Sequence, residues 1–424
     1  MSVVLPREIA YTPSLPALPE CQDYDIVLSP VNGGTFGPGQ LIQWDLTSRG
    51  FLDPNSLYIR YKYTLDNNGT EISTIKCTPV YSFFQKLETI FGSQVVESIN
   101  NYHQVCNLMT NLQLDVAMKY GQQSAYGYST GNTPSIEDLD GRTCLNDEVG
   151  SFSAPLPCIL SQAEKLVPLG LMPNVRVQLT TASIADAFAV FASPASVAPT
   201  NYTLSNVELC YSMIDFNASV NEMVKSMGDT FYIKSTSFKN MATTLSSGVT
   251  GSVELVYNMR LASIKSLFAL FSGQNARCVN GIFDSVDLTS GSGELVWNIA
   301  GVQHPNRPVS TLNNKNGALM ELKKAVGALH SESYNTSINA VEWNSVDNTT
   351  TTAVRPGKFY FGVNTEKLSS NGALLTGVST QNSPINLRIS IGSATTQAYT
   401  IACVAMYDCL LAIQANERNA SVRE

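Results

Sequence analysis

The sequence predicts an all-β protein made of two tandem domains that share one fold. The first observation is a repeated closing pattern, because residues 174–182 read Asn-Val-Arg-Val-Gln-Leu-Thr-Thr-Ala and residues 386–394 read Asn-Leu-Arg-Ile-Ser-Ile-Gly-Ser-Ala. A second match follows each copy: residues 202–209 and 399–406 both open with Tyr-Thr and an aliphatic residue. Alternating hydrophobic and polar positions in these segments are typical of half-buried strands. A repeat of roughly 200 residues is far longer than a solenoid unit, so it indicates duplicated domains.

The first half should begin with an extended arm over residues 1–23, which carries four prolines and little periodic pattern. Strands are expected over residues 25–30 and 40–46, separated by a glycine-rich turn. The clearest strand covers residues 55–65, bounded by the turn signal Asp-Asn-Asn-Gly. Its apolar face consists of Leu57, Ile59, Tyr61, Tyr63 and Leu65.

One stretch of the first half departs from the β pattern. Residues 94–119 contain neither proline nor glycine and place apolar side chains roughly at helical spacing, so we expect a helix there. The following residues, 120–153, are rich in Gly, Ser, Thr and Asp. They are expected to form a long excursion from the sheet rather than part of the core.

The domain junction is expected near residues 215–230, at a short helix over 217–225 with Asn217 or Ser219 as its N-cap. The second half should restart with strands and then contain one helix, followed by a loop. The expected strands cover residues 230–235, 252–257 and 263–271, the helix 317–330 and the loop 331–357. The predicted organisation is an arm (1–23), a first domain (24–216), a linker (217–229), a second domain (230–413) and a C-terminal tail (414–424).

Composition restricts the possible classes of function. Charged residues make up only 14% of the chain, against about 25% in a typical soluble domain. Such a surface is either largely covered by neighbouring molecules or belongs to a Ser/Thr/Asn-rich β-protein that is soluble alone. The 26 Lys and Arg are scattered and the net charge is −8, so no direct nucleic-acid binding is expected. No apolar stretch is long enough to span a membrane, and no signal peptide is predicted.

The search for catalytic or metal-binding patterns is mostly negative. The three histidines, His103, His304 and His330, show neither zinc-ligand nor metalloprotease spacing, and the nine cysteines contain no CxxC pair. We therefore expect reduced, mostly buried thiols. The Gly-rich residues 33–39 fit a turn better than a phosphate loop, and the acidic residues 137–141 fail the register of a calcium loop. Hence no catalytic, cofactor-binding or metal-binding residue is predicted, and the protein is expected not to be an enzyme.

Three segments carry a resemblance to a known family. Gly-Phe-Leu-Asp-Pro at 50–54 precedes the tyrosine-rich strand, residues 87–102 read as a strand, a Gly turn and a Glu-x-Ile-x-x-Tyr entry to a helix, and Pro-rich residues 154–169 precede the strand at 174. Together with the duplication, these segments resemble the double jelly-roll major capsid proteins of tailless icosahedral double-stranded DNA viruses, including adenovirus-like, virophage and polinton-like lineages. The resemblance spans roughly residues 24–413.

The resemblance implies both a fold and a function. The fold would be two tandem jelly-roll β-sandwiches with a few short helices in the loops. The function would be that of a major capsid protein, whose homotrimers form pseudo-hexameric capsomers of an icosahedral shell and have no active site or cofactor. Expected partners are the chain itself, neighbouring capsomers, and penton and minor capsid or cement proteins. The expected location is the virion, after synthesis in the host cytoplasm.

Two other classes of function remain open from the residues alone. One is a β-sandwich carbohydrate- or receptor-binding protein, such as a lectin-like or spike module. The other is a glycosidase with paired carboxylates, which 34 acidic residues permit but no motif indicates. The N-terminal arm carries an additional expectation: its apolar residues would gain from docking on a neighbour or on an inner-shell protein. A disordered tail is the alternative for the arm.

Overall fold

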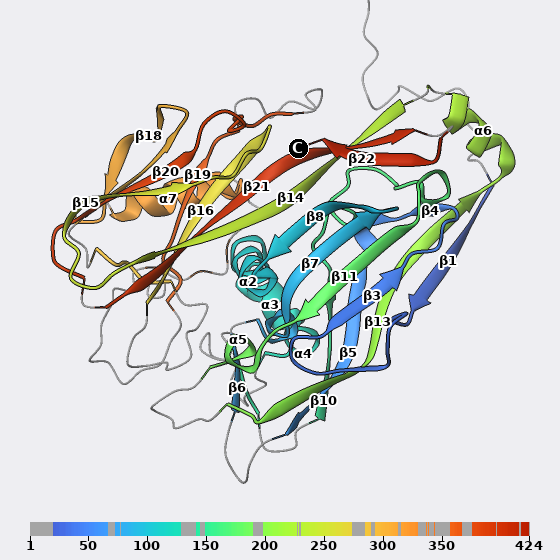
Figure 1. Cartoon of the computed structure of the whole chain (residues 1–424), viewed down its shortest axis with the longest axis horizontal. Coiled ribbons are helices and arrows are strands. Elements are labelled where there is room, and N and C mark those ends of the chain that lie inside the picture. The colour runs from blue at the N-terminus through green and yellow to red at the C-terminus, as the bar shows by residue number, and fades with distance from the viewer. Residues whose placement is uncertain are drawn as a thin grey trace, which may run out of the picture.

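A computed structural model gives the fold of the chain. It describes residues 20–66, 73–76, 78–128, 141–144, 149–189, 198–226, 228, 230–273, 285–289, 293–312, 315–329, 336, 338, 343, 357–366, 375–395, 397–414 and 417–423. The described residues form two β-sandwiches, one from each half of the sequence, which lie side by side (Figure 1).

The first sandwich consists of two sheets with the strand orders β1-β13-β5-β10 and β3-β11-β7-β8. Its main strands are β1 (Cys21–Leu28), β3 (Leu41–Asp45), β5 (Tyr58–Asp66), β7 (Phe84–Phe91), β8 (Gln94–Asn100), β10 (Val149–Pro155), β11 (Val175–Thr181) and β13 (Asn201–Phe216). Two short strands, β2 (Thr35–Phe36) and β4 (Phe51–Leu52), add to β13. A small separate sheet contains β6 (Ser73–Lys76), β9 (Gly141–Cys144) and β12 (Phe188–Ala189).

The second sandwich has the sheets β14-β21-β16-β19 and β15-β20-β17-β18. Its strands are β14 (Thr230–Leu245), β15 (Gly251–Tyr257), β16 (Ile264–Gly273), β17 (Glu294–Ile299), β18 (Val302–Ser310), β19 (Tyr360–Asn364), β20 (Ile385–Ile391) and β21 (Tyr399–Gln414). One further strand, β22 (Asn419–Arg423), pairs with the end of β21.

The two sandwiches have the same topology. When the eight main strands of each half are counted in chain order, both halves have sheets in the orders 1-8-3-6 and 2-7-4-5. The repeated sequences occupy equivalent places, since β11 and β20 are the seventh strands and β13 and β21 the eighth. This order is that of a jelly roll. The predicted fold class, two tandem jelly-roll sandwiches with a few short helices, is therefore confirmed.

Alternation of side chains builds the core of each sandwich. In β5 the burial pattern alternates along the whole strand, and the five apolar residues predicted to share a face are all buried. Tyr63 stacks on Phe152 of β10 with ring centroids 4.7 Å apart, while Tyr61 meets Phe84 edge to face at 5.4 Å. In the second sandwich, Trp297 is fully buried and stacks on Phe361.

Helices occupy connections between strands. They are α1 (Pro79–Ser82), α2 (Tyr102–Gln113), α3 (Val116–Gly121), α4 (Gln123–Tyr126), α5 (Ile184–Ala187), α6 (Ala218–Ser226) and α7 (Lys315–Ala325). Single 3-10 turns cover Pro54–Ser56 and Leu169–Leu171. Both α2 and α7 lie between the fifth and sixth strands of their sandwich, so the two predicted helices occupy equivalent places.

The prediction of a single helix over residues 94–119 is wrong in its first part and in its continuity. Residues 94–100 form β8, which pairs with β7 through a turn at Gly92. Asn101 then adopts a left-handed conformation (φ 47°) and α2 begins at Tyr102. Apolar spacing could not separate these states, because a bulge in β8 buries two neighbouring residues, Val96 and Glu97.

Other predicted segments agree with the structure only in part. Residues 120–153 are not entirely outside the core, since α4 and β10 lie there and Phe152 is buried. Residues 414–424 are not simply a tail, because β22 adds to the sheet of the second sandwich. The linker helix is α6, and Asn217 accepts a hydrogen bond from the Val220 amide (3.2 Å), as expected of its N-cap. Residues 1–19 and most of 331–357 lie outside the described residues.

The sheet that contains β14 and β21 extends beyond the rest of the second sandwich. Strands β14 and β21 each have 16 residues and pair along their full length, from Thr230↔Gln414 to Leu245↔Tyr399. Strand β16 covers β21 only as far as Tyr407. The remaining part, residues 230–236 of β14 and 408–414 of β21 together with β22, forms a projecting ribbon that lies beside the first sandwich (Figure 1).

Candidate functional site

The candidate functional site of this protein is the junction where the projecting ribbon lies against the first sandwich. The ribbon meets the loop that follows β10. The Glu164 amide donates to the Lys234 carbonyl at 2.9 Å, and the Ser235 hydroxyl donates to the Ile159 carbonyl at 2.6 Å. These bonds join backbone of one sandwich to backbone and side chain of the other. They fix the position of the second sandwich relative to the first.

A buried carboxylate, Glu97 of β8, lies at the centre of the junction with only 2% of its surface exposed. From the first sandwich it accepts hydrogen bonds from the Thr89 hydroxyl (2.9 Å) and the Ile159 amide (3.0 Å). From the second it accepts one from the Ser237 hydroxyl of β14 at 2.5 Å. Because a buried charge is tolerated only with such partners, Glu97 requires both sandwiches to be correctly placed.

A second buried carboxylate, Asp408 of β21, has both charged and neutral side chains as its neighbours. Its Oδ2 accepts from the Thr376 hydroxyl (2.9 Å), while its Oδ1 lies 3.7 Å from the ammonium of Lys234 and 3.5 Å from that of Lys265. Lys234 also approaches Glu164 of the first sandwich at 3.8 Å. A chain of alternating charges therefore runs from the first sandwich into the core of the second.

Helix α2 forms the other side of the junction. Ten of its twelve residues are buried, which exceeds what one face of a surface helix would bury. It packs on β7 and also meets the second sandwich: the Asn111 amide donates to the Tyr360 hydroxyl at 3.2 Å, and the Asn240 amide approaches Gln104 at 3.5 Å. The helix is thus a wedge between the two bodies (Figure 1).

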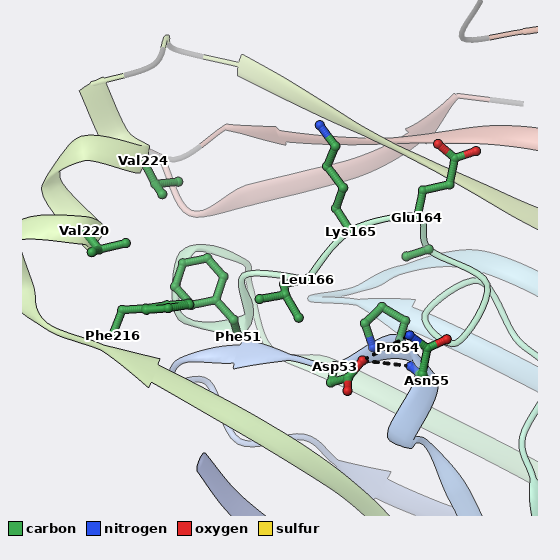
Figure 2. Close-up of a pocket in the computed structure, with 11 residues that line it drawn as sticks. Phe51, Asp53, Pro54, Asn55, Glu164, Lys165, Leu166, Phe216, Val220 and Val224 are labelled. Carbon is green, nitrogen blue, oxygen red and sulfur yellow. Dashed lines mark hydrogen bonds between the residues drawn. The ribbon is translucent and has the colours of Figure 1, made fainter. Parts of the chain in front are cut away.

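An open groove lies at the linker end of the junction, with a volume of about 520 Å³. Figure 2 shows its walls: α6 contributes Val220 and Val224, the end of β13 contributes Phe216, and the opposite side carries Phe51 and Leu166. The rings of Phe51 and Phe216 meet edge to face at 5.2 Å. Of the charged lining residues, Glu164 and Lys165 extend away from these apolar side chains, and Asp53 lies beside Pro54 and Asn55 (Figure 2).

The reactive side chains that the structure describes are mostly buried and inert. Burial lowers the pKa of His103 to about 4, so the ring is neutral near pH 7, and its Nδ1 lies 3.1 Å from the Phe84 carbonyl. Burial raises the pKa of the Cys158 thiol to about 12, and the charge of Glu97 acts in the same direction. Cys106 and Cys403 are likewise buried thiols with raised pKa values. Thiols in this state are poor nucleophiles.

The other residues weighed from the sequence are spread over the molecule. His304 of β18 lines a polar groove with Arg307, Glu321 and Lys324, whereas His330 and residues 137–140 lie outside the described residues. The Gly-rich residues 33–39 connect β1 to β3 and contain β2, as expected of a turn region. Trp44, Trp297 and Trp343 are all buried in the cores.

Two properties of the described residues bear on other functions. Among them, no group of three or more His, Cys, Asp or Glu side chains could hold a metal ion. Within the same part of the chain, no helix is long and apolar enough to cross a membrane.

The residues of the junction were missed by sequence reasoning. Glu97 lies in a stretch whose apolar spacing predicts a helix, and two of its partners, Ile159 and Ser237, are 62 and 140 residues away. The only local signal is an acidic residue next to Val96 in an apolar run. That signal does not identify a partner.

Comparison with solved structures identifies the architecture. No protein-family model matches the chain, and no curated protein matches it in sequence. A chain of the PBCV-1 virus capsid superposes with a TM-score of 0.65 at 11% identity, covering 98% of this chain and 99% of that one. The Faustovirus major capsid protein gives 0.63 at 7% identity, covering 96% and 92%. The fold is that of the double jelly-roll major capsid proteins.

A chain from the cryo-EM structure of the Sputnik virophage shows the same double jelly roll, with a TM-score of 0.58 at 13% identity and coverage of 100% and 92%. In all three cases the match extends over both sandwiches and the junction between them. The resemblance carried by residues 50–54, 87–102 and 154–169 is therefore confirmed at the level of the fold.

Proposed function

We propose that this double jelly roll is a viral major capsid protein, whose homotrimers form the pseudo-hexameric capsomers of an icosahedral shell. One observation carries the proposal. The chain consists of two sandwiches of identical topology side by side, and this pair superposes on 99% of a chain from the PBCV-1 virus capsid. Three such subunits around an axis present six similar sandwiches. That outline can tile a shell by hexagonal contacts.

The chemistry of the junction supports a structural role. The hydrogen-bonded carboxylates, the wedge helix and the ribbon all fix one sandwich relative to the other, and none of them leaves a reacting group open to a substrate. The buried imidazole of His103 and the buried thiols are placed for packing. We therefore propose that the protein is not an enzyme and works without a cofactor.

The surface supports association with other subunits. Several large apolar side chains are exposed on strands of both sandwiches, among them Val27 of β1, Val256 of β15 and Val302 of β18. Burial of such residues at subunit contacts gains about 25 cal/mol per Å² of apolar area. The proposed partners are further copies of the chain, neighbouring capsomers, and penton and minor capsid or cement proteins. The proposed location is the virion, after synthesis in the host cytoplasm.

The proposed units are the two sandwiches, predicted as 24–216 and 230–413 and extended by strands β1 and β22 to residues 21 and 423, joined by the linker 217–229. The test is the mass of the purified full chain at micromolar concentration, measured by light scattering and native mass spectrometry, followed by electron microscopy. A stable trimer with a hexagonal outline supports the proposal. A monomer, or a trimer that binds glycans on a glycan array, contradicts it and favours the carbohydrate-binding alternative.

A further inference from the structure

The apolar groove beside α6 has the features of a peptide-docking site. Its floor consists of two aromatic rings, Phe51 and Phe216, and aliphatic side chains from two other elements, and Figure 2 shows these side chains converging from opposite walls. Grooves lined by aromatic rings accommodate extended proline-rich segments, because such segments lose little conformational entropy on binding.

The N-terminal arm leaves the described part of the chain beside this groove. The Asn217 amide donates to the Glu20 carbonyl at 3.4 Å, and Cys21 pairs with Phe216, a residue of the groove floor. Strands β1 and β13 are antiparallel, so the chain preceding Cys21 continues in the direction in which α6 follows Phe216. Nineteen residues, 1–19, lie beyond this point.

The sequence of the adjoining part of the arm suits an apolar groove lined by aromatic rings. Residues 13–19 read Pro-Ser-Leu-Pro-Ala-Leu-Pro, so proline recurs every third position and leucine also at a spacing of three. A polyproline II helix has three residues per turn, which would align the prolines on one edge and the leucines on another. The segment carries no charge and would extend about 22 Å at about 3.1 Å per residue, long enough to lie along a nine-residue helix such as α6.

We propose that residues 13–19 dock in the groove of their own chain, with Leu15 and Leu18 contacting the apolar floor between α6 and Phe51. Docking in the same chain is favoured over exchange with another copy because the tether at Glu20 keeps the segment at high effective concentration. The proposal is independent of the capsid function. It leaves residues 1–12 free to contact a neighbour.

Cysteine cross-linking in the full chain tests the proposal directly. In a Cys21→Ser background, Leu18→Cys is combined with Val220→Cys in the groove or, as a control, with Glu222→Cys on the exposed side of the same helix. Mild oxidation should give an intrachain disulfide with the first pair only, seen as a faster monomer band on a non-reducing gel. An interchain disulfide at 220, equal cross-linking of both pairs, or no cross-link overturns the proposal.

Hydrogen exchange provides a second measurement that does not depend on introduced cysteines. The peptide covering residues 11–20 should exchange at least about tenfold faster in Val224→Asp than in the wild-type chain, because the charge disfavours the apolar segment. Met223→Asp, an exposed neighbour outside the groove lining, should leave the exchange of that peptide unchanged. Identical exchange in the wild-type and Val224→Asp chains overturns the proposal.

Discussion

The two sandwiches have the same strand order, but the helix between their fifth and sixth strands has very different surroundings. In the first sandwich α2 is covered on its own side by β7 and on the other by the second sandwich, and ten of its residues are buried. In the second sandwich α7 is covered on one side only, and three of its residues are buried. The same topological position therefore serves the junction in one copy and the outer surface in the other. The shared topology sets the position of the helix, and the elements packed around it determine how many of its residues are apolar and buried.

The largest effect should come from placing a charge in each helix. Met109 of α2 is 4% exposed, whereas Met320 of α7 is 49% exposed. Met109→Asp buries an unpaired carboxylate, which should cost more than a typical domain's stability margin and abolish soluble expression. Met320→Asp should change the free energy of unfolding by less than about 0.5 kcal/mol. Soluble yield and urea unfolding measure both, and a soluble Met109→Asp protein with the wild-type unfolding midpoint would refute the wedge role of α2.

A second comparison concerns the two buried carboxylates. Ser237→Ala removes one hydroxyl donor from Glu97, and Thr376→Val removes, with little change of shape, the hydroxyl that Asp408 shares with Glu366. Ser237→Ala should cost about 2 kcal/mol, because it removes a hydroxyl donor from a carboxylate that is only 2% exposed.

The Thr376→Val change should cost less, since Lys234 and Lys265 remain near Asp408. Urea denaturation of both variants gives the two losses of stability. Equal losses would mean that the lysines contribute nothing to the second site, and a smaller loss for Ser237→Ala would contradict the importance of the junction bond.

The third comparison uses pH. The pKa of His103 is about 4 in the folded chain against 6.5 for the free side chain, so between these values the unfolded state binds the extra proton. Stability from this group is complete above about pH 6.5 and is lost as the pH falls toward 4, by about 3 kcal/mol in total.

Because His103 lies in α2, acid should weaken the first sandwich before the second. Hydrogen exchange of peptides from each sandwich at pH 7, 5.5 and 4.5 measures this order. His103→Gln, which cannot take up a proton, should reduce the difference between pH 7 and pH 4.5. An unchanged difference in that variant would exclude His103 as its origin.

The smallest effect concerns the repeated arginines of the seventh strands. Arg176 is opposite Asp45, with Nε 2.7 Å from Oδ1, and Arg388 is opposite Glu254 in the equivalent pair of strands. Glu254 accepts a hydrogen bond from Asn386. Arg176→Ala should therefore cost up to about 1 kcal/mol and Arg388→Ala less, since surface ion pairs contribute little. Thermal unfolding measures the loss of stability in the two variants. A larger loss for Arg388→Ala than for Arg176→Ala would contradict this ranking of the two arginines.

The fold class and many of the strands could be predicted from the sequence, because alternating apolar and polar residues indicate which face of a strand is buried. The inward-facing side chains of β5 and the repeated strands β11 and β20 are examples, since each pattern lies within a few consecutive residues. The cap of α6 at Asn217 is equally local.

The junction could not be predicted in the same way. Glu97 is stabilised by a serine 140 residues away, and Asp408 by lysines on two other strands. The start of α2 was missed because a bulge disturbs the alternation of β8, so that its apolar residues also fit a helical period. The full lengths of β14 and β21 were also missed. Strand β14 continues to Leu245, beyond the predicted 230–235, and the second half of β21 is buried at nearly every position, so that alternation does not mark it.

The projecting ribbon has a mechanical consequence. Two strands of 16 residues, hydrogen-bonded throughout, form a beam about 50 Å long that begins in one sandwich and ends against the other. Bending such a beam requires many backbone hydrogen bonds to distort together, whereas a single-stranded tether would yield at a few dihedral angles. The two sandwiches of a subunit should therefore deform little relative to each other under load. In the proposed shell, curvature would be accommodated at the contacts between subunits, and mechanical failure would begin at those contacts.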